Sequence, residues 1–227
     1  MNHTTVTGSL KRKRPTGFSL NTVVLTEENR PRKVVRVMSA LPARLVEKVD
    51  TCNPQKKLET ILEQKGIRSK VRSYDSLPGF FEETKQEEID SYGHDALQAV
   101  READIEKLRN FHKEGRPLKC SNRFGESLLH LACRKALVKV VDFLLNEIEV
   151  PVRVKDDMGR SPLHDAFWTC EPNFELVDIL LEKCPDLLLV SDKRGHTPLH
   201  YARQNHWKKW NEYLNERTHL VVPSELV

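Results

Sequence analysis

Three segments of the chain repeat one another: NRFGESLLHLAC at Asn122–Cys133, DDMGRSPLHDAF at Asp156–Phe167 and DKRGHTPLHYAR at Asp192–Arg203. The tetrads within them begin at Ser127, Ser161 and Thr197, which gives periods of 34 and 36 residues. Self-similarity at a period of roughly 20 to 50 residues is typical of solenoids, in which one small unit stacks on the next. The sequence therefore predicts a stack of repeats.

The residues of each repeat indicate a tight turn followed by a pair of helices. A glycine lies two residues before each tetrad, where a tight turn needs a positive φ. The serine or threonine that opens the tetrad can cap the first helix, and Pro162 and Pro198 suit its first turn. The second helices carry apolar pairs such as Leu144–Leu145 and Leu180–Leu181, which only stacking can bury.

The pattern D-x-x-G-x-T-P-L-H-x-A resembles the ankyrin repeat. The match is strong at Asp192–Ala202 and at Asp156–Ala166, and weaker at Asn122–Ala132, where Leu128 replaces the proline. The resemblance covers about residues 92–217, with Ala99–Asn122 as an N-terminal cap. It implies an all-α, helix-turn-helix solenoid of about four units, and its C-terminal cap would contain Trp207, Trp210, Tyr213 and Leu214.

The rest of the chain does not show the repeat pattern. We expect a mostly disordered basic leader at 1–40, short amphipathic helices at 41–72, an acidic linker at 73–91 and a tail at 218–227. Asn53 and Pro54 together are a helix-start signal, and Gly66 can end that helix.

Positive charge is concentrated before the repeats. Residues 1–72 hold 16 lysines and arginines against 6 acidic residues, whereas residues 91–227 hold 20 against 21. Two basic clusters stand out, and they resemble a two-part nuclear import signal: Lys11, Arg12, Lys13, Arg14 and Arg30, Arg32, Lys33. Such clusters also attract nucleic acid or acidic membrane, and a plain solvated tail is the remaining alternative.

The repeated histidines, His130, His164 and His200, invite a metal or catalytic interpretation. They should lie one repeat apart, roughly 10 Å, which is too far to share a metal whose bonds to nitrogen are about 2 Å long. The ankyrin resemblance instead implies that they tie adjacent turns by hydrogen bonds. His164 and Asp165 with Cys170 do not form a catalytic set, because neighbours in sequence on a helix do not face each other. With no nucleotide-binding or hydrolase motif present, we expect no enzyme, no cofactor and no metal.

Composition indicates in which cellular compartment we expect the protein. No apolar run approaches the roughly 18 residues that a membrane span needs, and the N-terminus has no apolar segment typical of a secretory signal. The five cysteines are irregularly spaced, which favours reduced thiols in an intracellular protein, cytoplasmic, nuclear or both.

The resemblance also implies where a partner binds, because ankyrin-like stacks meet partners at the turn tips and at the exposed end of each first helix. Large apolar groups at such sites often anchor an interface. The alternative is that Trp168 tucks under its own lengthened turn and Phe124 packs on the cap. The predicted surface comprises Arg123, Phe124, Glu126, Arg134, Lys135, Asp157, Met158, Arg160, Trp168, Lys193, Arg194 and His196.

These observations favour a monomeric scaffold or adaptor that holds a protein partner. The basic residues of the predicted surface suggest that the partner is acidic. The alternative is a nuclear regulator that contacts nucleic acid through its basic leader.

Overall fold

The computed structural model describes residues 52–68 and 70–222. The leader at 1–40 and its two basic clusters therefore lie outside the described residues, as do the first part of the predicted 41–72 region and the end of the tail. No helix in the described ranges combines the length and apolar character that crossing a bilayer requires.

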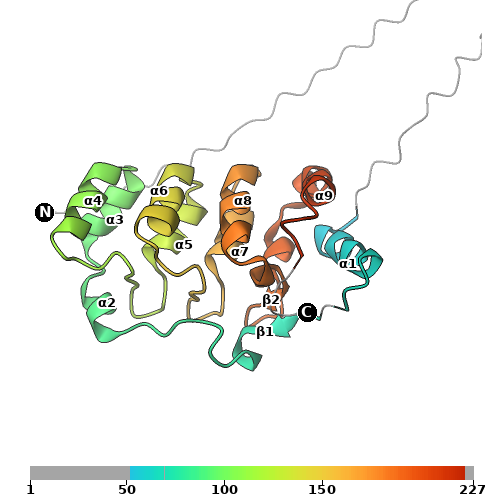
Figure 1. The fold of residues 1–227 in the computed structure, drawn as a ribbon, viewed down its shortest axis with the longest axis horizontal. Helices are drawn as coiled ribbons and strands as arrows, with labels where there is room; N and C mark the ends of the chain where they lie inside the picture. Colours follow the sequence, from blue (N-terminus) through green and yellow to red (C-terminus); the bar gives the residue numbers. More distant parts are fainter. Residues whose placement is uncertain (1–51, 69, 223–227) are drawn as a thin grey trace, which may run out of the picture. The chain divides into compact units, whose positions relative to one another are not determined.

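The repeats form a row of helix pairs, in which each pair packs against the next in chain order (Figure 1). Each first helix is short, and the connection to the second helix is tight except between α7 and α8, where residues 168–173 lengthen it. The pairs are α3 (His94–Arg101) with α4 (Ile105–Lys113), α5 (Leu128–Arg134) with α6 (Val138–Asp142), α7 (Pro162–Phe167) with α8 (Phe174–Lys183), and the 3-10 turns η4 (Pro198–Tyr201) and η5 (Gln204–His206) with α9 (Trp207–Glu216). The described part is therefore mostly helical, as the tetrads predict.

The same side-chain contacts recur in each turn. Asp156 Oδ1 accepts hydrogen bonds from the backbone N–H groups of Met158 (2.9 Å) and Arg160 (2.8 Å), and Asn122 and Asp192 do the same in their turns. Gly159 has a φ of 76°. An added Cβ there would lie 2.5 Å from the ring of Tyr74, so this turn needs glycine for its conformation and for space.

Two of the three tetrad histidines, His130 and His164, tie adjacent turns, whereas exposed His200 bonds only within its own tetrad among the described residues. His130 Nδ1 accepts the backbone N–H of Ser127 (3.2 Å), which leaves the proton on Nε2 for the carbonyl oxygen of Arg160 in the next turn (3.0 Å). His164 repeats the arrangement with the carbonyl oxygen of His196 (3.1 Å). Burial lowers the pKa of both histidines to about 4, so both rings are neutral at pH 7. The expected role of His130 and His164 in tying adjacent turns is confirmed.

The segment before the repeats packs at a position that its residue pattern does not predict. Helix α1 (Pro54–Gln64) starts at the Asn53 cap, as predicted, but it packs against α9 at the far end of the row (Figure 1). The hydroxyl of Thr197 donates to Gln55 Oε1 (2.6 Å), and Asn211 Nδ2 donates to the carbonyl oxygen of Cys52 (2.9 Å). Leu58, Ile61 and Leu62 are buried in this contact with the stack.

From α1 the chain returns along the repeats to α3, and we call residues 70–91 the return segment. Its strand β1 (Arg72–Ser73) pairs in parallel with β2 (Val190–Ser191), so the fold is not purely α. Further along, the N–H of Glu82 donates to the carbonyl oxygen of Arg153 (2.9 Å), and Phe80 and Phe81 are buried. The residues expected to form an acidic linker at 73–91 are thus packed, and they include helix α2 (Gln86–Asp90).

The neutral histidines make stability depend on pH. Their folded pKa values, about 4, lie below the unfolded value of about 6.5, so the unfolded chain binds more protons between those limits and stability falls as the pH falls. Burial raises the pKa of Asp165 to about 6, chiefly by desolvation. This carboxyl therefore adds stability as the pH falls, which opposes the effect of the histidines. Because two histidines oppose one carboxyl, we expect a net loss of a few kcal/mol between about pH 6.5 and 4, measured by urea denaturation. The H164Q variant should be less stable at neutral pH but should have a markedly smaller slope; equal slopes would contradict this account.

Candidate partner-binding surface

The predicted surface residues lie outside the core, because each is exposed or half-buried. Phe124 retains 48% of its accessible area and Trp168 retains 55%. Among the described large apolar residues, only Val71 of the return segment is comparably exposed. The two side chains singled out from the sequence are therefore free to contact a partner.

The turn tips are bonded to one another along the row. The N–H of Asp157 donates to the carbonyl oxygen of Phe124 (2.7 Å), and the N–H of Lys193 donates to that of Met158 (2.9 Å). These bonds fix the tips relative to each other before any partner arrives. A surface ordered in this way loses little conformational entropy on binding.

Trp168 does not pack beneath its own turn. Its ring centroid lies 5.5 Å from that of Tyr201 in the next repeat, and Tyr201 meets His164 edge-on at 5.4 Å. The hydroxyl of Tyr201 donates to Asp192 Oδ2 (2.6 Å) and accepts a hydrogen bond from Arg194 (2.7 Å). Tyr201 thus links the exposed indole to the last turn tip. This role cannot be predicted from the repeat pattern, in which the residue after each tetrad is variable.

The positive charge expected across this surface is partly neutralised within the chain. Arg134 pairs with Glu126, Arg160 Nε donates to Asp156 Oδ2 (2.7 Å), and Arg194 lies 3.6 Å from Asp192. In the described ranges Arg123, Lys135 and Lys193 form no ion pair. Three of the six basic residues that suggested an acidic partner, Arg134, Arg160 and Arg194, therefore already lie beside acids of the same chain.

Arg123 and Phe124 interact with each other at the first tip. The guanidinium carbon of Arg123 lies 4.7 Å from the centroid of the Phe124 ring. Phe124 therefore extends outward with a cation on one side, and it does not pack on the cap. Asp157, Met158 and His196 occupy the remaining tips, with Met158 half-buried.

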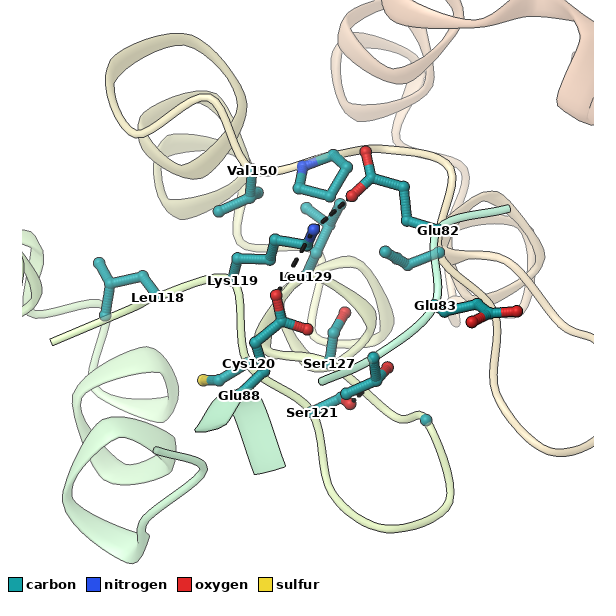
Figure 2. A pocket seen from close by; sticks show the side chains of 14 residues that line it. Glu82, Glu83, Glu88, Leu118, Lys119, Cys120, Ser121, Ser127, Leu129 and Val150 are labelled. Atoms are coloured by element: carbon teal, nitrogen blue, oxygen red, sulfur yellow. Dashed lines mark hydrogen bonds and ion pairs between the residues drawn. The ribbon is translucent and has the colours of Figure 1, made fainter. Parts of the chain in front are cut away.

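A cleft between the return segment and the first repeats is a structural contact rather than a ligand site. Figure 2 shows Lys119 between Glu82 and Glu88, with which it forms ion pairs. The free space is about 20 Å³, roughly enough for one water molecule. Burial raises the pKa of nearby Cys120 to about 12, so its thiol is protonated and unreactive at neutral pH.

Nothing in the described ranges gathers three or more His, Cys, Asp or Glu side chains into a group that could hold a metal ion. Helix pairs of similar length, tight glycine turns and an ordered row of exposed tips define a repeat-built binding module. Residues 96–188 match the family model described as "Ankyrin repeats (3 copies)". This part of the chain consists of ankyrin repeats, which indicate a protein–protein interaction module.

Three relatives each match less than half of the chain. The human "SMC5-SMC6 complex localization factor protein 1" is 36% identical over 102 residues, which is 44% of this chain and 9% of the relative. Its bovine counterpart is 37% identical over 97 residues, 42% of this chain and 8% of the relative. "Putative ankyrin repeat protein YahD" of Escherichia coli (strain K12) is 33% identical over 104 residues, 44% of this chain and 51% of the relative. The chain thus spans less than a tenth of the length of the two mammalian relatives.

Proposed function

We propose that the ankyrin repeats act as an adaptor that holds a protein partner against the turn tips and the exposed ends of the first helices, with no catalytic step. The observation that carries this proposal is the continuous set of contacts between the two exposed aromatic residues. Phe124 is bonded through its carbonyl to the second tip, that tip is bonded to Lys193 in the third, and Arg194 reaches Trp168 through Tyr201.

Two physical features make this surface suitable for binding. Exposed Phe124, half-exposed Met158 and exposed Trp168 supply the kind of large apolar anchors that dominate interface energetics. Arg134 and Arg160 are held by neighbouring acids, so they can form part of a polar rim without first having to be ordered.

The mammalian relatives support an adaptor more than an isolated binder. Their printed name describes a factor that localises the SMC5–SMC6 complex. We propose a comparable task here, in which the repeats bind a molecule that determines where an attached assembly resides in the nucleus. The chain would act as a monomer in this role, with one binding surface for each copy.

The direct test is capture from nuclear extract by the full chain, quantified by mass spectrometry. The F124A/M158A/W168A variant should reduce capture of the enriched partner by roughly 30-fold or more, because losing even one interface anchor costs about 2 kcal/mol, or roughly 30-fold in affinity. Helical content and melting temperature should stay near those of the wild type, because none of these side chains belongs to the core.

A matched control replaces Lys139, Glu175 and Glu212 by alanine, since these exposed residues lie on the second helices α6, α8 and α9. The control should capture the partner normally. Undiminished capture by the F124A/M158A/W168A variant would show that the chosen surface is wrong, whereas its unfolding would show that those side chains are structural.

A second role is proposed for the basic leader, on the strength of its 16 basic against 6 acidic groups in residues 1–72. If the leader contacts nucleic acid phosphates, raising the salt from about 50 to 200 mM should weaken duplex binding on the order of a thousandfold. Alanine at Lys11, Arg12, Lys13 and Arg14 should flatten that dependence. An affinity insensitive to salt would exclude this role.

A further inference from the structure

Asp165 on α7 is a buried acid on the partner-binding side of the repeats. It directly follows His164 of the tetrad and retains only 7% of its accessible area. Trp168, one of the two exposed aromatic anchors, lies three residues later at the end of the same helix. Residues three apart on a helix lie on one face, so Asp165 and Trp168 project from the same face of α7.

The carboxylate of Asp165 has no partner among the described residues. Arg134 of α5 and Arg160 of the preceding turn are the nearest cations that influence it, yet Arg134 pairs with Glu126 and Arg160 pairs with Asp156. Among the described residues, none forms a hydrogen bond or an ion pair with the Asp165 side chain.

This arrangement is unfavourable for the isolated protein. Burial raises the pKa of Asp165 to about 6, with Asp156 adding to the rise and Arg134 and Arg160 opposing it. The thiol of Cys133 on α5, which also lies near, stays neutral because burial raises its pKa as well. At pH 7 the chain therefore holds a mostly ionised, unpaired carboxylate in a desolvated position. Such groups recur at functional sites more often than stability alone would allow.

The surroundings of Asp165 define which ligand chemistry fits. An aromatic face attracts a cation through its quadrupole, and a desolvated carboxylate attracts the same charge more strongly than it would in water. Tyr201 supports the Trp168 ring from the next repeat, at 5.5 Å between centroids. An anion would instead be repelled by the Asp165 carboxylate. The two arginines near it are already paired with other acids, so they offer an anion little compensation.

We propose that Asp165 and Trp168 form the binding site for a cationic side chain, lysine or arginine, from a peptide segment of the protein partner. This inference rests on the proposed function, because it assigns chemistry to one point of the same partner-binding surface. It replaces the acidic partner suggested by the sequence with one that presents at least one positive charge to the repeat containing α7.

Two consequences follow from the site. The bound cation compensates the charge of Asp165, so binding strengthens as the pH rises from about 5 to 7 and the carboxyl loses its proton. The D165N variant lacks the buried charge, so its melting temperature should equal or exceed that of the wild type while binding is weakened.

The test titrates the ¹⁵N-labelled full chain with short blocked glycine–serine peptides that carry one lysine, arginine, norleucine or glutamate. The reporter is the indole N–H resonance of Trp168, assigned with W168F. The lysine or arginine peptide should shift this resonance with a dissociation constant on the order of millimolar. D165N should weaken that binding roughly tenfold.

The matched control is D75N, which removes one exposed carboxylate from the return segment and should leave binding unchanged. Equal binding of the norleucine peptide, stronger binding of the glutamate peptide, or an unaltered affinity in D165N would each overturn the proposal. If F124A/M158A/W168A loses the partner from nuclear extract while D165N retains it, the surface stands and the cation site fails. If neither variant loses it, both proposals fail.

Discussion

The structure depends on a neutral histidine held between two turns. In the second and third repeats, the ring accepts a backbone N–H from its own tetrad and donates to a carbonyl oxygen of the next turn. Both bonds need the neutral Nε2–H form, and burial stabilises that form by lowering the pKa. These bonds hold each turn in a set position relative to the next. The turn tips that carry Phe124, Met158 and the basic residues therefore form a defined surface.

A stack of this kind must close its final turn, because no further carbonyl is available to the last tetrad. Here α1 supplies the closure, through the hydrogen bond from Thr197 to Gln55 and through Leu58 and Leu62 packed beside α9. The return segment then runs back along the repeats, and its backbone is bonded at β2 and at Arg153. The residues before the repeats are therefore part of the binding module, although the recognised repeats cover only residues 96–188.

Sequence analysis succeeded where a contact is local or periodic. The tetrads, the turn glycines and the Asn53 cap concern residues within a few positions of one another, so their pattern predicts their structure. The pattern of Leu58, Ile61 and Leu62 predicts a helix with an apolar face, but it does not identify α9 as the element that covers this face. Phe80 and Phe81 lack any period and were read as part of a linker. Asp165 is left without an ion pair because Arg134 and Arg160 pair with other acids. Which acid each arginine pairs with depends on the three-dimensional structure, so the sequence alone does not predict it.

The central claim is that the return segment, α1 and the repeats form one cooperative unit that presents a rigid surface. Native-state hydrogen exchange of the full chain tests it most directly. The hydrogen-bonded amides of α1 and the amide of Glu82 should exchange with the same high protection as those of α9, because they open only when the stack opens. Rapid exchange across residues 54–91, together with strong protection of α5 to α8, would contradict the claim.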